Sequence, residues 1–342
     1  MENSRTENDE ITKASPRSRN TRKRKKTASM RVVFLSVILT ALIVGVVSYV
    51  AAYRKAKSEF AHLRQPVVIE EGEALRTLRD NLQQGSGVTT ALRRSIKDYL
   101  VLNLGDRYLF APINYNLKMH KRTRENLKKD EPFWDYRENG RSVAEKGIDV
   151  SSHQGEIRWN EVKESGVEFA ICRAVFRGYE SGKLVVDECF ERNAAGANEN
   201  GIRLGAYLFS QAVNEEEMNE EIDLLLETVK PYQVEGPLVM DIELTEAGTG
   251  RADGLTVEER TALAKIFEKR IREAGYEPAF YYNYEAALTL IDITELEDSE
   301  KWYASYTEDF YYPYYYTFWQ YSAKGKVNGI DSEVDLDLWF KD

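Results

Sequence analysis

From Lys146 onward the chain alternates between short apolar runs and longer stretches with apolar residues at helical spacing. The apolar runs predict eight strands, at 147–151, 168–176, 203–210, 237–244, 278–283, 301–307, 317–322 and 333–339. The periodic stretches between the earlier runs predict five helices, at 159–166, 187–201, 215–230, 256–275 and 284–291. This order over 146–342 predicts the α/β class and an irregular, TIM-like (β/α) barrel whose last crossovers are loops.

A second pattern precedes the barrel, because Val32 to Ala52 is a run of twenty-one residues without a charge. As a helix with a rise of about 1.5 Å per residue, this run would span roughly 30 Å, the hydrocarbon thickness of a bilayer. The basic cluster Arg22–Arg31 before it predicts a cytoplasmic N-terminus. We therefore predict a single-pass protein of the cell membrane, with a disordered basic tail over 1–31, a transmembrane helix over 32–53 and an extracytoplasmic barrel.

Residues 54–145 predict an extracytoplasmic, mainly helical spacer and linker. Helical periodicity extends to about Leu104 and is interrupted by Gly-Ser-Gly at 85–87. A short strand with a turn is predicted over 108–117, and residues 118–142 are polar and linker-like. This region could recruit envelope proteins as partners.

The charge distribution argues against a nucleic-acid-binding body. The net charge is −10, although residues 1–31 hold ten basic and four acidic side chains, so the barrel region is strongly acidic. Cys172 and Cys189 could form one disulfide, but Cys172 lies in an apolar run and more readily packs as a small hydrophobic residue. None of the three histidines has metal-ligand spacing with another.

The candidate chemistry lies in the predicted fourth strand, GPLVMDIEL, which carries Asp241 and Glu243. Residues two apart in a strand share a face, so both carboxyls are expected at one barrel mouth, where Asp149 and Asp335 end other strands. Clustering and burial raise carboxyl pKa values, and a protonated acid beside a carboxylate is what glycosidic bond cleavage needs. A solvated strand face and a divalent-cation site are the alternatives. The Cα separation of about 6.6–6.8 Å leaves both the retaining and the inverting course open.

The segment KGIDVSSHQGEIRWNEVKESGVEFAICRA, from Lys146, resembles the opening of glycoside hydrolase family 25, the Chalaropsis-type lysozymes. Further matching segments follow in the same order: GAYLFS, VMDIEL, FYYN, WYASY, WQYS and GIDSEVDLDLW. The resemblance covers about residues 146–340. It implies a muramidase that cleaves the β-1,4 bond between N-acetylmuramic acid and N-acetylglucosamine in peptidoglycan, with no metal or cofactor.

By position, the resemblance makes Glu243 the general acid and Asp241 its assistant, as nucleophile, as stabiliser of the acetamido group or as positioner of water. Asp149 and Asp335 match the other active-site acids. Four strand-end residues are expected to contact sugar: Tyr207, Tyr282, Trp319 and Gln320.

Two departures from the family pattern affect the expected sugar groove. Leu208 replaces the usual histidine, and RAVFRG at 173–178 lacks the usual Thr and Glu. Three functions remain open: a membrane-anchored muramidase that remodels the cell's own wall, a peptidoglycan-binding module with weak or no turnover, and a scaffold that acts through 54–145. The intact acids favour the first.

Overall fold

The computed structural model describes residues 40, 42–50, 72–245 and 248–341. The chain divides into two compact units, Met1–Val67 and Val68–Asp342. In the first unit residues 42–50 are helical. No helix among the described residues has the length and apolar character needed to cross a membrane, and most of the predicted 32–53 span lies outside them. The predicted tail, 1–31, and residues 54–71 also lie outside.

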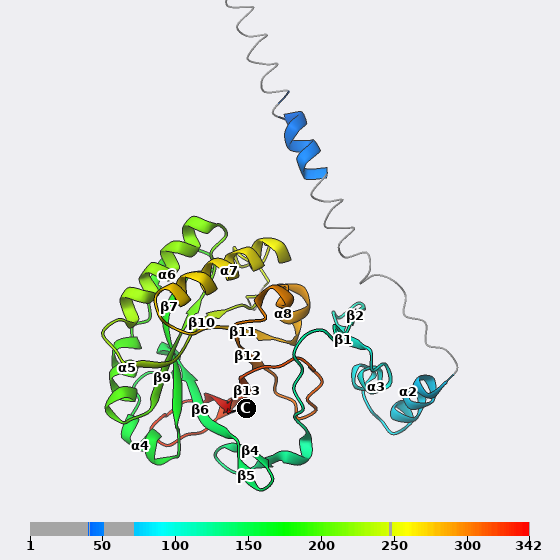
Figure 1. Cartoon of the computed structure of the whole chain (residues 1–342), viewed down its shortest axis with the longest axis horizontal. Helices are drawn as coiled ribbons and strands as arrows, with labels where there is room; N and C mark the ends of the chain where they lie inside the picture. The colour runs from blue at the N-terminus through cyan, green and yellow to red at the C-terminus, as the bar shows by residue number, and fades with distance from the viewer. Residues whose placement is uncertain (1–39, 41, 51–71, 246–247, 342) are drawn as a thin grey trace, which may run out of the picture. The chain divides into compact units, whose positions relative to one another are not determined.

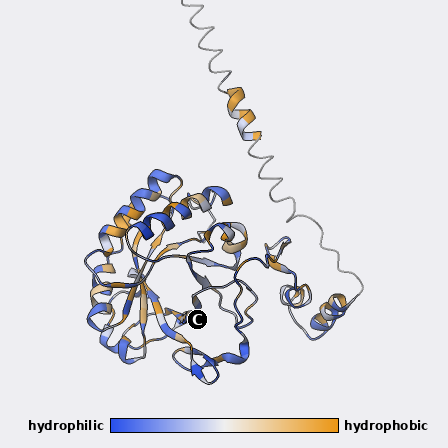
Figure 2. Ribbon diagram, in the orientation of Figure 1, coloured by the Kyte–Doolittle hydropathy of each residue, from blue (hydrophilic) through white to orange (hydrophobic). Residues whose placement is uncertain are grey.

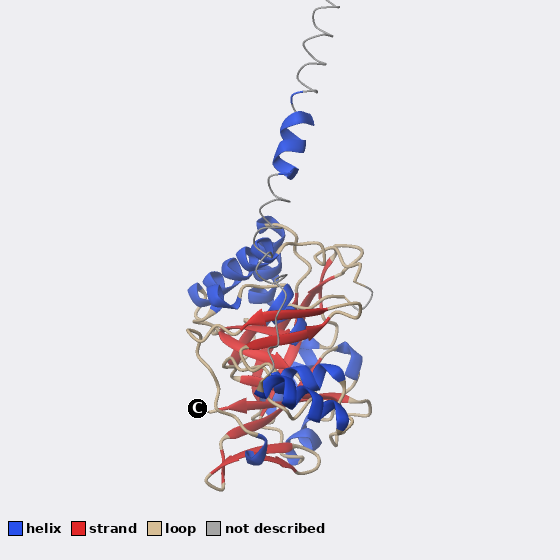
Figure 3. Ribbon diagram, turned by 90° about the vertical axis from the view of Figure 1, so that its right-hand side faces the viewer, coloured by secondary structure: helices blue, strands red, loops and turns tan. Residues whose placement is uncertain are grey.

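Within the described part of the second unit, eight strands close into a barrel (Figures 1 and 3). They are β6 (Ala144–Val150), β7 (Phe169–Arg177), β9 (Arg203–Phe209), β10 (Val234–Asp241), β11 (Pro278–Asn283), β12 (Glu300–Ala304), β13 (Phe318–Gly325) and β14 (Val334–Phe340). The barrel is closed by the β6–β7 pairing, and β14 runs antiparallel to both of its neighbours, β6 and β13. The short strand β8 (Leu184–Val186) pairs with β7 outside the ring. The predicted barrel is therefore confirmed.

The five predicted helices are also present in the described barrel, and they lie around the strands in Figure 1. They are α4 (Trp159–Glu164), α5 (Phe190–Glu199), α6 (Glu215–Val229), α7 (Val257–Glu273) and α8 (Tyr284–Thr289). Local chemistry sets their ends: Asn214 caps α6, and Thr256 with Glu259 forms a capping box on α7. Gly275, with φ of +86°, follows α7. The last two strands are reached without a helix, as predicted.

Two hydrophobic clusters stabilise the barrel. The larger one lies mainly between strands and helices, and the smaller one fills the barrel interior with Phe169, Ile171, Val239, Ala279, Trp302 and Phe318. Val239 is inside while Met240 belongs to the larger cluster, so β10 has the predicted alternation of faces. Figure 2 shows the resulting distribution, with hydrophobic strands inside and hydrophilic outer helix surfaces.

The region before the barrel differs from the predicted linker. Helices α2 (Glu73–Gln83) and α3 (Val88–Ser95) agree with the helical prediction up to Ser95, but its extension to Leu104 is wrong. The apolar run there forms strand β1 (Tyr99–Asn103), which pairs with β2 (Tyr108–Pro112) in a hairpin. The predicted polar linker 118–142 instead forms β3 (Leu127–Lys129), β4 (Trp134–Glu138) and β5 (Arg141–Ser142), joined in one sheet.

This sheet packs against the barrel. Trp134 stacks on Tyr321 of β13 with ring centroids 4.6 Å apart, and Tyr136 is buried against Phe340 of β14. The guanidinium of buried Arg122 lies 3.6 Å over the Phe340 ring. Residues 118–142 are thus part of the domain that carries the barrel.

Candidate active site

The four predicted acids gather where the barrel strands end: Asp149, Asp241, Glu243 and Asp335. Asp241 is the last residue of β10, and Asp149 on β6 lies directly opposite Asp335 on β14 in the sheet register. This pairing arises because β14 is antiparallel, so its first residues lie beside the last residues of β6. Charge–charge interactions link Asp335 to both Asp149 and Glu243. The acids therefore form one cluster.

Strand β10 ends at Asp241 rather than at Leu244, so Glu243 lies just beyond the strand. The N–H of Ile242 still donates to the carbonyl of Tyr281 at 2.9 Å, which continues the pairing by one residue. Asp241 is buried and its Oδ1 has no hydrogen-bond partner among the described residues, whereas Glu243 is half-buried. The arrangement places a deep carboxyl beside a more accessible one.

The environment holds protons on this pair. Burial and the charge of Glu243 raise the pKa of Asp241 well above its usual value, while Arg173 opposes the shift. Burial and the charge of Asp335 raise the pKa of Glu243. Because the pKa of each carboxyl is raised, the pair retains a proton at higher pH than isolated carboxyls would.

Gln320 connects the acid cluster to the aromatic rim. Its Nε2 donates to Oδ2 of Asp149 at 2.8 Å, and its Oε1 accepts from the hydroxyls of Tyr281 and Tyr306, each at 2.9 Å. The three bonds fix the orientation of the amide. Burial, together with the charges of Asp335 and Asp337, raises the pKa of Asp149 well above its usual value.

A fifth acid, Asp337, was not among the predicted site residues. It is fully buried, and Nε1 of Trp302 donates to its Oδ1 at 2.8 Å. Burial raises its pKa to about 8, and the hydrogen bond from Trp302 opposes the shift. The signal was present, because EVDLD repeats the spacing of two residues seen in DIE.

We expect Asp337→Asn to stabilise the protein at alkaline pH. The folded protein binds a proton at Asp337 up to about pH 8, whereas an unfolded Asp releases it near pH 3.9. The free energy of unfolding of the native chain therefore falls as pH rises between these values. Asn removes this dependence and keeps an oxygen that accepts from Trp302, so its advantage should grow by about 1–3 kcal/mol between pH 5 and pH 8.

Denaturant unfolding of both proteins at several pH values measures this difference. The control is Asp106→Asn, which changes a carboxyl whose side chain is 77% exposed. An advantage of Asp337→Asn that is the same at pH 5 and pH 8 would contradict the prediction.

The two arginines of β7 have different surroundings. Arg173 donates from Nε to Asp187 at 2.7 Å and from Nη2 to the Ser152 hydroxyl at 2.9 Å, and its charge reaches Asp241. Arg177 is buried and donates to Glu221 at 2.7 Å. Of these two arginines, Arg173 is the one whose charge opposes the raised pKa of Asp241.

The predicted sugar-contacting residues separate into two groups. Tyr207 lies against the interior cluster, and Gln320 bonds to Asp149. Trp319 borders the groove that contains Glu243, but its ring is fully buried in the larger hydrophobic cluster and its Nε1 donates to the carbonyl of Ser305 at 2.9 Å. Tyr282 packs in the larger hydrophobic cluster between strands and helices, which we call the outer core. Its ring is fully buried, and its hydroxyl lies 3.3 Å from that of Tyr312. The side chain of the neighbouring Tyr281 lies on the inner face of the barrel, against the interior cluster.

Glu243 lies in a groove of about 370 Å³, a volume within the range of small-ligand sites, about 300–1,000 Å³. Tyr281, Tyr306 and Trp319 are among its lining residues. The groove therefore combines an acid with aromatic surface, which suits a sugar ring.

The two departures from the family pattern also have a structural explanation. Leu208 was expected to affect the sugar groove, but it is fully buried in the outer core. In RAVFRG, the register of β7 against β9 shifts between Arg173 and Val175, which marks a bulge with an extra residue. Ala174 and Val175 are both buried in the outer core.

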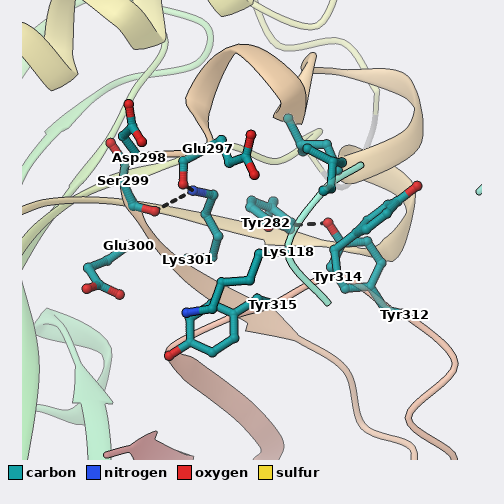
Figure 4. A pocket seen from close by; sticks show the side chains of 12 residues that line it. Lys118, Tyr282, Glu297, Asp298, Ser299, Glu300, Lys301, Tyr312, Tyr314 and Tyr315 are labelled. Atoms are coloured by element: carbon teal, nitrogen blue, oxygen red, sulfur yellow. Dashed lines mark hydrogen bonds between the residues drawn. The ribbon is translucent and has the colours of Figure 1, made fainter. Parts of the chain in front are cut away.

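A second cavity, of about 180 Å³, lies at the opposite end of β12 (Figure 4). Buried Lys301 lies in it and donates from Nζ to the carbonyls of Leu296, Glu297 and Ser299. The ammonium group therefore caps the backbone of the preceding turn, and none of the five clustered acids lines this cavity.

Cys172 and Cys189 are both buried and unpaired with each other. Among the described residues, no three His, Cys, Asp or Glu side chains are arranged to hold a metal ion.

Comparison with known proteins identifies this arrangement. "Uncharacterized protein YegX" of Escherichia coli is 29% identical over 210 residues, which is 56% of this chain and 68% of YegX. The "Autolytic lysozyme" of Clostridium acetobutylicum is 26% identical over 193 residues, which is 56% of this chain and 55% of that protein. "Lysozyme M1" of Streptomyces globisporus is 29% identical over 203 residues, which is 55% of this chain and 65% of that protein.

The structure of the modular autolysin LytC from Streptococcus pneumoniae shares the fold, with a TM-score of 0.51 and 21% identity. The alignment covers 72% of this chain and 57% of LytC. The sequence profile described as "Glycosyl hydrolases family 25" matches residues 148–330, more than half of the chain. The resemblance of the sequence motifs is thus confirmed, and the chain belongs to glycosyl hydrolases family 25.

Proposed function

We propose that this glycoside hydrolase is an N-acetylmuramidase that cleaves the β-1,4 bond between N-acetylmuramic acid and N-acetylglucosamine in peptidoglycan. The observation that carries the proposal is the pair of Glu243 and Asp241, both with raised pKa values, beside a groove with aromatic lining. Two relatives are named as lysozymes, and LytC has been solved in complex with a synthetic peptidoglycan ligand. These names support peptidoglycan as the substrate.

In the proposed reaction, Glu243 protonates the oxygen of the leaving sugar because it is the more accessible member of the pair. Asp241, whose Oδ1 is free of described partners, faces the positive charge that develops at the anomeric carbon. Arg173 favours the ionised form of Asp241. Tyr306, which is exposed on the groove wall, supplies a surface for a sugar ring.

We further propose that the enzyme is anchored by residues 32–53 and remodels the cell's own wall. The uncharged run with its basic flank supports the anchor. A tethered hydrolase acts only within the reach of its anchor, which suits remodelling better than attack on another cell. The autolytic lysozyme and the autolysin among the relatives agree with a wall substrate in the same cell.

Product analysis tests the proposed activity. The full chain is incubated with purified peptidoglycan, and the released fragments are reduced and identified by mass spectrometry. We expect fragments that end in reduced N-acetylmuramic acid. Fragments that end in reduced N-acetylglucosamine would contradict the bond assignment, and a chain that sediments with the wall without releasing fragments would favour the binding module.

A further inference from the structure

A small module outside the family match forms part of the active-site groove. It comprises residues 72–112, with α2, α3, β1 and β2, and we call it the N-terminal module. Leu100 of this module is buried in the main hydrophobic cluster, and Ala111 packs against the same cluster. The module is thus fixed to the barrel rather than a free spacer.

Arg93 of α3 lies at the junction between this module and the barrel. Its guanidinium is 4.5 Å from the ring centroid of Tyr284 and 5.4 Å from that of Tyr311. Its Nε donates to the carbonyl of Val101 at 2.9 Å. A guanidinium has five N–H donors, and this bond uses one of them. Stacking and this bond position the guanidinium, which also interacts with the hydroxyl of Tyr284.

The same side chain lines the groove that contains Glu243. Leu102 of the module lines it as well. Of the described residues that line this groove, Arg93 is the one with a positive charge, while Glu243 and Glu285 are acidic. A carboxylate on a substrate would be repelled by the acid cluster and attracted by Arg93.

We propose that Arg93 is a specificity-determining residue that binds a carboxylate of the glycan substrate and so distinguishes peptidoglycan from neutral glycans. The inference rests on the proposed function, since peptidoglycan is the substrate that carries such groups. They occur on its peptide stems, and on the lactyl group of N-acetylmuramic acid once a stem has been removed. Arg is suited to this role because its planar fork matches a carboxylate.

Kinetics on three soluble preparations of one glycan test the proposal: with peptide stems, with stems removed so that lactyl carboxylates are exposed, and with all carboxyls converted to amides. We expect Arg93→Gln to lower kcat/KM about tenfold on a carboxylate-bearing glycan, mainly through KM, and to leave the amidated glycan unaffected. Arg93→Lys, which keeps the charge, should retain part of the preference. Arg79→Gln is the matched control, since it removes an exposed arginine of α2 that does not line the groove.

The three preparations separate the outcomes. If Arg93→Gln lowers kcat/KM only on the stem-bearing glycan, Arg93 binds a carboxylate of the peptide stem. If it lowers kcat/KM on the glycan without stems, Arg93 binds the carboxylate of the lactyl group. An equal loss on all three glycans would show that Arg93 only fastens the module, and no loss on any would also overturn the inference. A wild-type chain that cleaves none of them would refute the proposed function, and the inference with it.

Discussion

Glu243→Gln is expected to lower kcat for glycan cleavage by about a thousandfold or more. The substitution keeps the size of the side chain but removes the proton that the leaving sugar requires, and general acid catalysis typically contributes about 10²–10⁴-fold. The half-buried position of Glu243 and its raised pKa support its proposed role as the acid of the pair. The rate of reducing-end release from a soluble glycan measures the effect.

A matched control lies in the same groove. Glu285 also lines it but is exposed on α8, and Glu285→Gln should change kcat by less than about threefold. Glu243→Gln should still bind peptidoglycan, because the groove and its aromatic lining are unchanged. If this variant retains more than a tenth of the wild-type kcat, Glu243 is not the general acid.

Most of the barrel could be predicted because its strands and helices obey local periodicities. The apolar run FAICRAVF predicted β7, and the helical spacing of 256–275 predicted α7. Residues 118–142 were misread because few of them are apolar. Their packing depends on contacts of Trp134 with Tyr321 and of Tyr136 with Phe340, about two hundred residues away along the chain, and local patterns contain no information on such contacts.

The candidate site shows where periodicity is insufficient. Asp241 and Glu243 could be paired by their spacing, since the neighbouring apolar residues fix which face is inside. Tyr281 and Tyr282 could not be distinguished in this way, because both faces of a barrel strand are buried and both residues are tyrosines. The choice of Tyr282 therefore rested on resemblance, and the structure instead directs Tyr281 to Gln320.

Asp337 was missed for a related reason. Its repeat with Asp335 is visible in EVDLD, but that pattern does not show that Trp302 lies opposite with an N–H to donate. The partner comes from β12, a strand that does not neighbour β14 in the sheet, so only the closed barrel brings the two side chains together.

Asp241→Asn is expected to lower kcat by about a hundredfold or more in a protein that remains folded, and the free energy of unfolding should rise relative to the native chain as pH increases, because burial raises the pKa of Asp241. The amide keeps the shape of the buried side chain, but it cannot stabilise or attack a cationic anomeric carbon. In the native enzyme the rate is expected to fall at low pH (the acid limb) and at high pH (the alkaline limb), and both limbs reflect the titration of Asp241 and Glu243 as a pair. With Asp241 neutral, the acid limb should disappear, whereas the alkaline limb should remain because burial and Asp335 still raise the pKa of Glu243.

The pH profile of kcat on a soluble glycan distinguishes this role from a structural one. Asp309→Asn, at an exposed position in the loop after β12, serves as the control and should retain both limbs. A loss of activity in Asp241→Asn with both limbs intact would mean that Asp241 only positions other groups. Loss of the acid limb would instead mean that the charge of Asp241 takes part in the reaction, and the two carboxyls at the end of β10, Asp241 and Glu243, would then have separate chemical tasks.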